Sequence, residues 1–244
     1  MDPIMALIAA AVGYLLGSIS FARIVAGRVD PTADVTRIET VVGAGVTFTS
    51  DSVSATAVRM KVGRRYGILT ALLDMLKVAL PTLAFELAFP DQPYFLLVAA
   101  AGLVGHDWPI YHRFKGGRGE TAIYGALLVI DPIGVVVTLI LGMILGFASG
   151  NILVFRWAGM ILLIPWFWLT TGDPALVAYM VFADAVYLFA MRPELGQYFA
   201  MRGEHVDPTN EEIADEFGMG AKLGRAIDRY GLPGLISRVR PTPS

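Results

Sequence analysis

The chain has 244 residues, of which 55% are hydrophobic and only 16% are charged, and its mean hydropathy is +0.61. This balance excludes an ordinary soluble domain and is typical of a polytopic membrane protein. No cysteine is present, which excludes disulfides and thiol chemistry, and the net charge of -2 matters less here than the sidedness of the charges.

Seven apolar segments are candidates for membrane spans, each of which needs about 20 mainly apolar residues. The N-terminus lacks a basic region and its apolar run is long, so we expect a retained span there and no cleaved signal. Gly17-Ser18 in this first span allows close approach of a second helix. The fourth segment is short and needs a locally thinned bilayer or a re-entrant corner. The segments are roughly 4–27, 67–89, 93–111, 120–130, 132–150, 155–172 and 174–191.

The positions of the basic residues orient these spans. Of the 19 Lys and Arg residues, Lys77 lies within a span, Arg23 lies in the last turns of the first span, and Arg156 lies at the border of the sixth. With the N-terminus outside, the others fall in or beside the inside segments, and the outside turns carry only acidic charges, as the positive-inside rule requires. The sequence therefore predicts an all-α membrane protein: a seven-helix transmembrane domain over residues 1–204, with the N-terminus outside and a cytoplasmic tail over 205–244.

The first inside segment, residues 28–66, is long and rich in hydroxyl side chains. One interpretation is a solvated loop followed by a basic helix that anchors on anionic headgroups. The alternative is a loop that folds back over the inner mouth of the bundle, with its hydroxyls and Arg59 facing a polar substrate.

The tail is predicted to contain two short helices. Thr209 and Glu212 form a capping-box pattern before an acidic helix. A second helix near 219–230 has Leu223 and Ile227 on one side and basic residues on the other, which is typical of a helix on the inner leaflet or on a protein partner.

The segment with the clearest functional pattern follows the third span. There, Lys115-Gly116-Gly117-Arg118-Gly119 leads into the next helix. Glycines let backbone N–H groups converge, the helix N-terminus adds positive potential, and Lys and Arg add full charges, so the segment suits a phosphate group. A plain tight turn that anchors to lipid phosphates fits the spacing about equally well, and the spacing is not that of a Walker A loop.

Three further residues near this segment are polar where apolar residues are expected. His106 ends the third span, where it can orient a substrate, although a histidine bonded to a nearby carbonyl is the more common case. Asp74 and Lys77 lie one turn apart within the second span, and pairing is the simpler explanation for both. The motifs of zinc hydrolases and of elbow-serine hydrolases are absent, and we expect no metal and no cofactor.

Several of these motifs resemble one family, the bacterial integral-membrane glycerol-3-phosphate acyltransferases that use acyl-phosphate as donor. The similarity covers residues 5 to about 204, and the match around the glycine-rich segment is the most specific. The tail lies beyond it. The matching stretches are residues 13–19, 54–56, 62–69, 73–77, 105–109 and 114–119.

The chain departs from the family pattern in several places. The family's arginine after the hydroxyl-rich loop falls on Met60, with Arg59 one place off, and Gly119 is followed by Glu120, where the family usually has an apolar residue. In the loop at residues 49–57, Ser50 and Thr56 keep the register, but the asparagines and glycines of the family are absent. The family's His-x-x-Asn pair is replaced here by Arg192 and Leu195.

The resemblance implies acyl transfer from acyl-phosphate to the 1-hydroxyl of glycerol 3-phosphate, without a metal or a covalent enzyme intermediate. It implies catalytic roles for Ser50, Arg59, His106 and Lys115. It further implies that substrate binding involves Thr56, Lys77, Gly116, Gly117, Arg118 and Gly119. In this scheme Lys115 and Arg118 hold phosphate, Ser50 and Arg59 contact the acceptor, and His106 supports the glycine-rich segment.

The implied location is the bacterial inner membrane, with membrane lipids and the two substrates as partners, no nucleic acid, and a possible protein partner for residues 205–244. Two other hypotheses remain open. The first is a catalytically silent relative that serves as a lipid-binding or assembly subunit, which Arg192 and Leu195 favour. The second is a small-solute transporter, which the absence of an internal repeat argues against.

Overall fold

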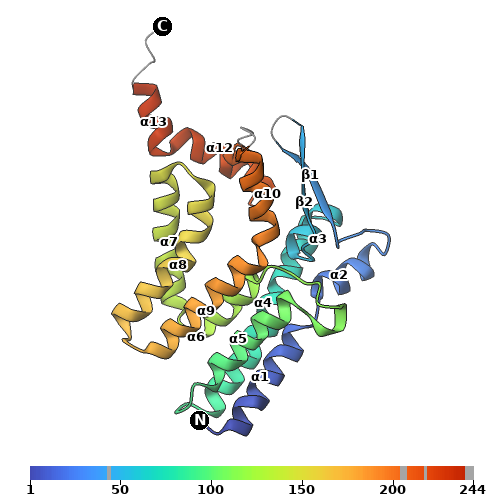
Figure 1. Ribbon diagram of the computed structural model, residues 1–244, viewed down its shortest axis with the longest axis vertical. Helices are drawn as coiled ribbons and strands as arrows, with labels where there is room; N and C mark the ends of the chain where they lie inside the picture. The colour runs from blue at the N-terminus through green and yellow to red at the C-terminus, as the bar shows by residue number, and fades with distance from the viewer. Residues whose placement is uncertain (43–44, 204–207, 217–218, 240–244) are drawn as a thin grey trace. The chain divides into compact units, whose positions relative to one another are not determined.

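The computed structural model of the chain describes residues 1–42, 45–203, 208–216 and 219–239 and is mostly helical (Figure 1). The first half contains α1 (Pro3–Gly17), α2 (Phe21–Val29), β1 (Ile38–Val42), β2 (Val46–Ser50), α3 (Ala55–Lys61), α4 (Arg64–Ala88), α5 (Tyr94–Asp107) and the 3-10 helix η1 (Ile110–His112). The second half contains α6 (Glu120–Ile130), α7 (Pro132–Ser149), α8 (Ile152–Thr170), α9 (Pro174–Ala190), α10 (Arg192–Gly203), α11 (Asn210–Glu216), α12 (Ala221–Tyr230) and α13 (Leu232–Val239).

The helices long and apolar enough to cross a bilayer number four among the described residues, or five if the bent pair of α9 and α10 is one span. The first of the four is the stretch Pro3–Val29, which joins α1 and α2, and the others are α4, α7 and α8. The helices α5 and α6 have 14 and 11 residues. Both are shorter than the roughly 20 residues that a perpendicular span needs. The protein is therefore a multi-pass membrane protein with several apolar helices.

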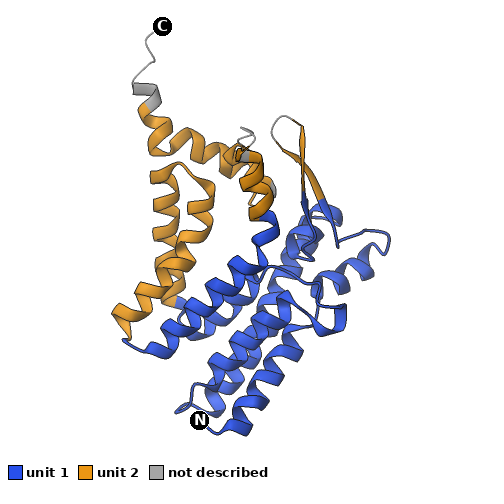
Figure 2. Cartoon of the chain, in the orientation of Figure 1, with its two compact units in different colours: residues 1–38, 49–132, 172–194 blue, residues 39–48, 133–171, 195–244 orange. Residues whose placement is uncertain are grey.

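The chain forms two compact units, coloured separately in Figure 2. Unit 1 consists of residues 1–38, 49–132 and 172–194, and unit 2 consists of residues 39–48, 133–171 and 195–244. The predicted boundary at residue 204 stays a prediction.

In unit 1, α1 and α5 are in very close contact because glycines face each other's backbone. A Cβ atom on Gly13 would overlap the backbone of Val98, and one on Gly17 would overlap the backbone of Gly102. The predicted role of Gly17 in close helix approach is confirmed. This packing lets the ends of α1 and α5 meet, as Gly105 does with the backbone of Tyr14.

The prediction of an all-α protein is wrong in one respect, because β1 and β2 form a two-stranded sheet within the segment 28–66. Both strands are rich in Val, Ile and Thr, whose branched Cβ atoms favour extended backbone. The segment is not simply solvated. In unit 1, Val35, Ile38, Val53 and Val58 are buried against residues of α2.

In unit 2, α7 and α8 pack closely, since a Cβ on Gly142 would meet the backbone of Gly159. The predicted capping box is confirmed: Glu212 Oε2 accepts from the Thr209 backbone N–H at 2.8 Å, and the Glu212 N–H donates to Thr209 Oγ1 at 3.2 Å. The predicted helices of the tail are α11 and α12. Residues 205–207, 217–218 and 240–244 of the predicted tail lie outside the described residues.

Candidate functional site

The glycine-rich segment folds back against the end of α5. The backbone N–H of Gly117 donates to the carbonyl of His106 at 3.1 Å, and the N–H of Lys115 donates to the carbonyl of His112 at 3.1 Å. Gly116 and Gly117 lie so close to His106 that a Cβ on either would overlap it. Two of the amides that a phosphate cradle would offer are thus bonded within the chain, and the segment is a tight turn as well as a candidate anion site.

The turn before the glycine-rich segment has an uncommon backbone. Arg113 and Phe114 have φ values of 53° and 61°, in the left-handed region that residues other than glycine seldom adopt. The Phe114 N–H donates to the carbonyl of Pro109 at 3.0 Å, which holds this conformation. Gly119, with φ of 85°, is the N-cap of α6. Residues with left-handed backbone thus precede the glycine-rich segment and end it. The backbone strain at Arg113 and Phe114 is compensated by the surrounding contacts that hold the segment in place.

Arg118 is held by an acidic residue that the sequence analysis did not single out. Glu194, near the start of α10, is 3% exposed. Its Oε1 accepts from Arg118 Nη2 at 2.5 Å and from Arg118 Nε at 3.0 Å. The same oxygen accepts from the Ser50 hydroxyl at 2.7 Å. Ser50 and Arg118, predicted separately as site residues, are thus brought together by one carboxylate.

The inner side of the site contains the polar residues of α4 and α5. Lys77 Nζ lies 2.8 Å from Asp74 Oδ1 and donates to the carbonyl of Ile19 at 2.7 Å, where the break between α1 and α2 leaves that carbonyl accessible. The predicted pairing of Asp74 with Lys77 is confirmed. His106 Nδ1 lies 3.8 Å from Asp74 Oδ1, which is too far for a hydrogen bond. This nitrogen has no hydrogen-bond partner among the described residues.

Two other predicted residues, Thr56 and Arg59, lie on the helix that follows the sheet. Thr56 and Arg59 are partly buried on α3, which begins just after Val53. The Val53 N–H donates to the Gly116 carbonyl at 2.9 Å, so the loop before α3 contacts the glycine-rich segment. This contact brings part of the segment 28–66 against the glycine-rich segment, and that Arg59 and the hydroxyls face a polar substrate stays a prediction.

Cationic side chains surround the outer part of the site. Lys115 is exposed, and its carbonyl accepts from Arg23 Nη1 at 3.0 Å. Partial burial, together with the positive charges of Arg23 and Lys77, lowers the pKa of His112 below its usual value. Burial is the larger cause of this shift, and the charges of Arg23 and Lys77 add a positive potential, in which an anion is stabilised.

A cavity of about 10 Å³, lined by Ser18, Asp74, Lys77, His106 and Gly117 among others, lies between these groups. This volume holds about one water molecule. Among the residues that the structure describes, no three His, Asp or Glu side chains are grouped so as to bind a metal ion.

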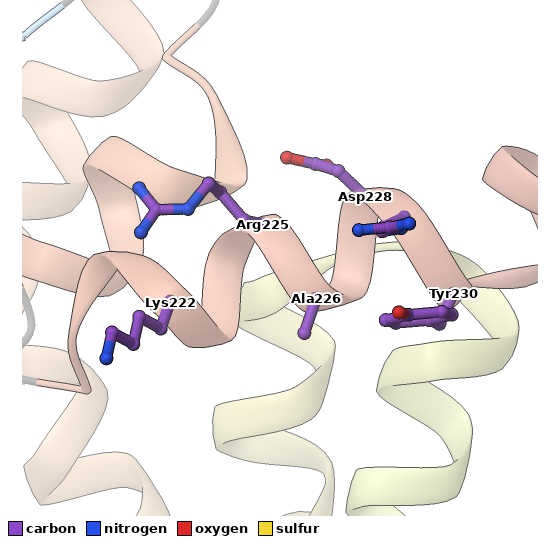
Figure 3. A pocket seen from close by; sticks show the side chains of 6 residues that line it. Lys222, Arg225, Ala226, Asp228 and Tyr230 are labelled. Atoms are coloured by element: carbon purple, nitrogen blue, oxygen red, sulfur yellow. The ribbon is translucent and has the colours of Figure 1, made fainter.

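A second pocket, of about 550 Å³ and widely open, lies on α12 in unit 2, where Lys222, Arg225 and Tyr230 project from the helix (Figure 3). Arg225 pairs with Glu211. The apolar side of α12 is not available to a leaflet as predicted, because Ile227 and Leu223 pack in the core of unit 2. That the tail binds lipid or a protein partner stays a prediction.

Comparisons with known proteins identify the family of the chain. The profile of the family described as glycerol-3-phosphate acyltransferase matches residues 7–200. A glycerol-3-phosphate acyltransferase of Syntrophotalea carbinolica is 35% identical over 150 residues, which are 57% of this chain and 71% of that protein. One of Anaeromyxobacter sp. is 35% identical over 135 residues, which are 54% of this chain and 61% of that protein.

Among solved structures, the fold is similar to that of an integral membrane glycerol 3-phosphate acyltransferase in its glycerol 3-phosphate form. The TM-score is 0.65 and the identity 23%, with 81% of this chain and 93% of that chain covered. At this identity the likeness concerns the fold alone. Because the sequence profile matches most of the chain, from residue 7 to residue 200, this protein belongs to the glycerol-3-phosphate acyltransferase family.

Proposed function

We propose that the protein transfers an acyl group from acyl-phosphate to the 1-hydroxyl of glycerol 3-phosphate and produces lysophosphatidate for phospholipid synthesis. The family match over residues 7–200 carries this proposal. The named relatives are glycerol-3-phosphate acyltransferases, and the similar structures are described as a glycerol 3-phosphate form and a lysophosphatidic acid form. A polar site at the ends of apolar helices also suits a reaction between a soluble phosphate and a lipid chain.

In the proposed reaction the acceptor hydroxyl attacks the acyl carbonyl, the new ester bond forms, and phosphate leaves with the electrons of the broken carbon–oxygen bond. The hydroxyl proton passes to the departing phosphate. The chain's contribution is positioning and fixed charge. Lys115 and Arg118 hold phosphate, Ser50 and Arg59 contact the acceptor, and His106 supports the glycine-rich segment. Arg118 binds Glu194 through Nε and Nη2. Its Nη1 makes a long contact of 3.5 Å with the Gly117 carbonyl, and we propose that the Nη1 donors bind a phosphate oxygen.

Thr56, Lys77 and the three glycines complete the proposed substrate-binding set. The glycines keep the backbone close to His106, and Lys77 contributes to the positive potential that acts on His112. A catalytically silent relative is not favoured by the comparisons, although Arg192 does occupy the place of the family's histidine. Its guanidinium lies 4.5 Å from the ring centroid of Phe189.

The direct test is a turnover assay. Purified protein in detergent or vesicles, supplied with palmitoyl-phosphate and labelled glycerol 3-phosphate, is expected to form labelled lysophosphatidate and to release phosphate in equal amount. Reactions without the donor serve as controls. Folded protein that forms no labelled lipid would refute the proposed function.

We further propose the seven-span topology in the bacterial inner membrane, with the N-terminus outside and the C-terminus in the cytoplasm. The four or five long spans, together with the shorter helices α5 and α6, support it. Because the natural chain has no cysteine, single cysteines report sidedness directly. An impermeant maleimide applied to intact spheroplasts is expected to label Asp91→Cys but to label Lys61→Cys only after permeabilisation. The reverse pattern would overturn the orientation.

A further inference from the structure

The two carboxylate oxygens of Glu194 have different surroundings. Oε1 accepts three hydrogen bonds, from the Ser50 hydroxyl and from two nitrogens of Arg118. Oε2 is fully buried and has no hydrogen-bond partner among the described residues. A buried carboxylate oxygen without a donor is unfavourable, because it has lost its water and gained no replacement. The arrangement thus holds one oxygen of Glu194 rigidly and leaves the other in need of a donor.

The charges near Glu194 indicate which kind of donor fits. Glu194 forms an ion pair with Arg118, and the pair is made through Oε1. A phosphate placed directly against Oε2 would bring a second anion against the carboxylate, whereas a hydroxyl donates a hydrogen bond and adds no charge. The complement of Oε2 is therefore a neutral hydroxyl.

Only one of the two proposed substrates offers such a group. Glycerol 3-phosphate has two alcohol hydroxyls, whereas an acyl-phosphate has an apolar chain, a carbonyl and a phosphate. We propose that Glu194 binds a hydroxyl of the acceptor through Oε2, while Ser50 and Arg118 fix its other oxygen. Glu194 then sets the acceptor specificity of the site. Because Glu194 also contacts Arg118, the group that binds the acceptor hydroxyl is held next to the group that binds phosphate. This inference rests on the proposed function.

The test compares an acceptor that has hydroxyls with an analogue that has none. Glu194→Gln keeps an oxygen for Ser50 and Arg118 but puts an amide donor in place of Oε2. Glu194→Asp keeps the charge and withdraws the carboxylate by one methylene. For both variants the KM of glycerol 3-phosphate is expected to rise about tenfold or more, the typical effect of losing one charge-assisted hydrogen bond. The inhibition constant of propyl phosphate, which has the phosphate and no hydroxyl, is expected to stay the same or to fall.

Asp184→Asn is the matched control, because Asp184 is also a buried acid of unit 1, on α9, and belongs to neither proposed substrate site. It is expected to leave both constants unchanged. A merely structural role for Glu194 would weaken both ligands by the same factor and would overturn the inference. An unchanged KM of glycerol 3-phosphate in the two Glu194 variants would also overturn the inference. A lower KM would do the same, because it would mean that Glu194 competes with the substrate phosphate for Arg118.

The proposed function and this inference fail in different ways. If the wild-type protein forms no lysophosphatidate, the proposed function fails before any variant is compared. If the wild-type protein is active and the ratio of the two constants does not change in Glu194→Gln and Glu194→Asp, the function stands and the role of Glu194 is refuted.

Discussion

Replacing Arg118 with methionine is expected to lower the free energy of unfolding by about 3 kcal/mol or more and to reduce turnover below detection. The side chain of Glu194 is 3% exposed, and Arg118 is its only cationic partner among the ion pairs that the structure describes. Without the guanidinium the carboxylate would stay buried without a counter-charge, and Ser50 alone would not compensate. Thermal unfolding in detergent and the palmitoyl-phosphate assay measure the two effects.

A double variant separates stability from activity. Replacing both Arg118 and Glu194 with methionine removes the uncompensated charge and fills a similar volume, so much of the lost stability is expected to return. Turnover is expected to stay low, because both proposed substrate contacts are gone. An Arg118→Met protein that unfolds at the wild-type temperature would contradict the importance of this buried pair.

Gly117→Ala is expected to lower the free energy of unfolding by about 1–3 kcal/mol, in the range of other overpacked sites, and to remove most of the activity. The new methyl group would overlap the imidazole of His106, which is buried between α4 and the glycine-rich segment and has little room to move. The segment would have to shift away from α5 and would carry Lys115 and Arg118 with it. The same thermal unfolding and turnover measurements report both consequences.

Gly27→Ala is the control for this substitution. Gly27 lies within α2, and a Cβ there meets nothing within 4 Å. Alanine favours helix over glycine by up to about 1 kcal/mol, so this variant is expected to be as stable as the wild type or slightly more stable. Full activity in Gly117→Ala would show that the glycine-rich segment tolerates displacement, and the proposed phosphate contacts would then lie elsewhere.

The features that the sequence predicted well are those that depend on neighbouring residues. Asp74 and Lys77 are three positions apart and meet on one helix face, and Thr209 and Glu212 are likewise three apart across a helix start. The close approach at Gly17 followed from the small size of that residue alone. In the first two cases the geometry of one helix or its N-terminus determines the contact. For Gly17 the sequence indicates only that a close approach is possible, and the structure shows that the partner is Gly102 of α5.

The features that were missed depend on packing between distant parts of the chain. The sheet of β1 and β2 was missed because its strands have only five residues each in a segment dominated by hydroxyl side chains. The apolar side of α12 was expected to lie on the inner leaflet or on a protein partner, because an amphipathic pattern shows that a helix has an apolar side and not what covers it. In the structure, Ile152 of α8 and Ile213 of α11 cover it.

By itself, the sequence determined that this protein is an apolar, membrane-embedded helical chain with a glycine-rich cationic segment, because hydropathy and turn chemistry are sums over adjacent residues. Only the tertiary structure decided which acid meets that segment. Glu194 lies 76 residues from Arg118 and 144 from Ser50, and an isolated glutamate after a span gives no local signal of such a contact. The contact exists because packing within unit 1 brings Glu194 to Ser50 and Arg118, where a buried carboxylate needs donors.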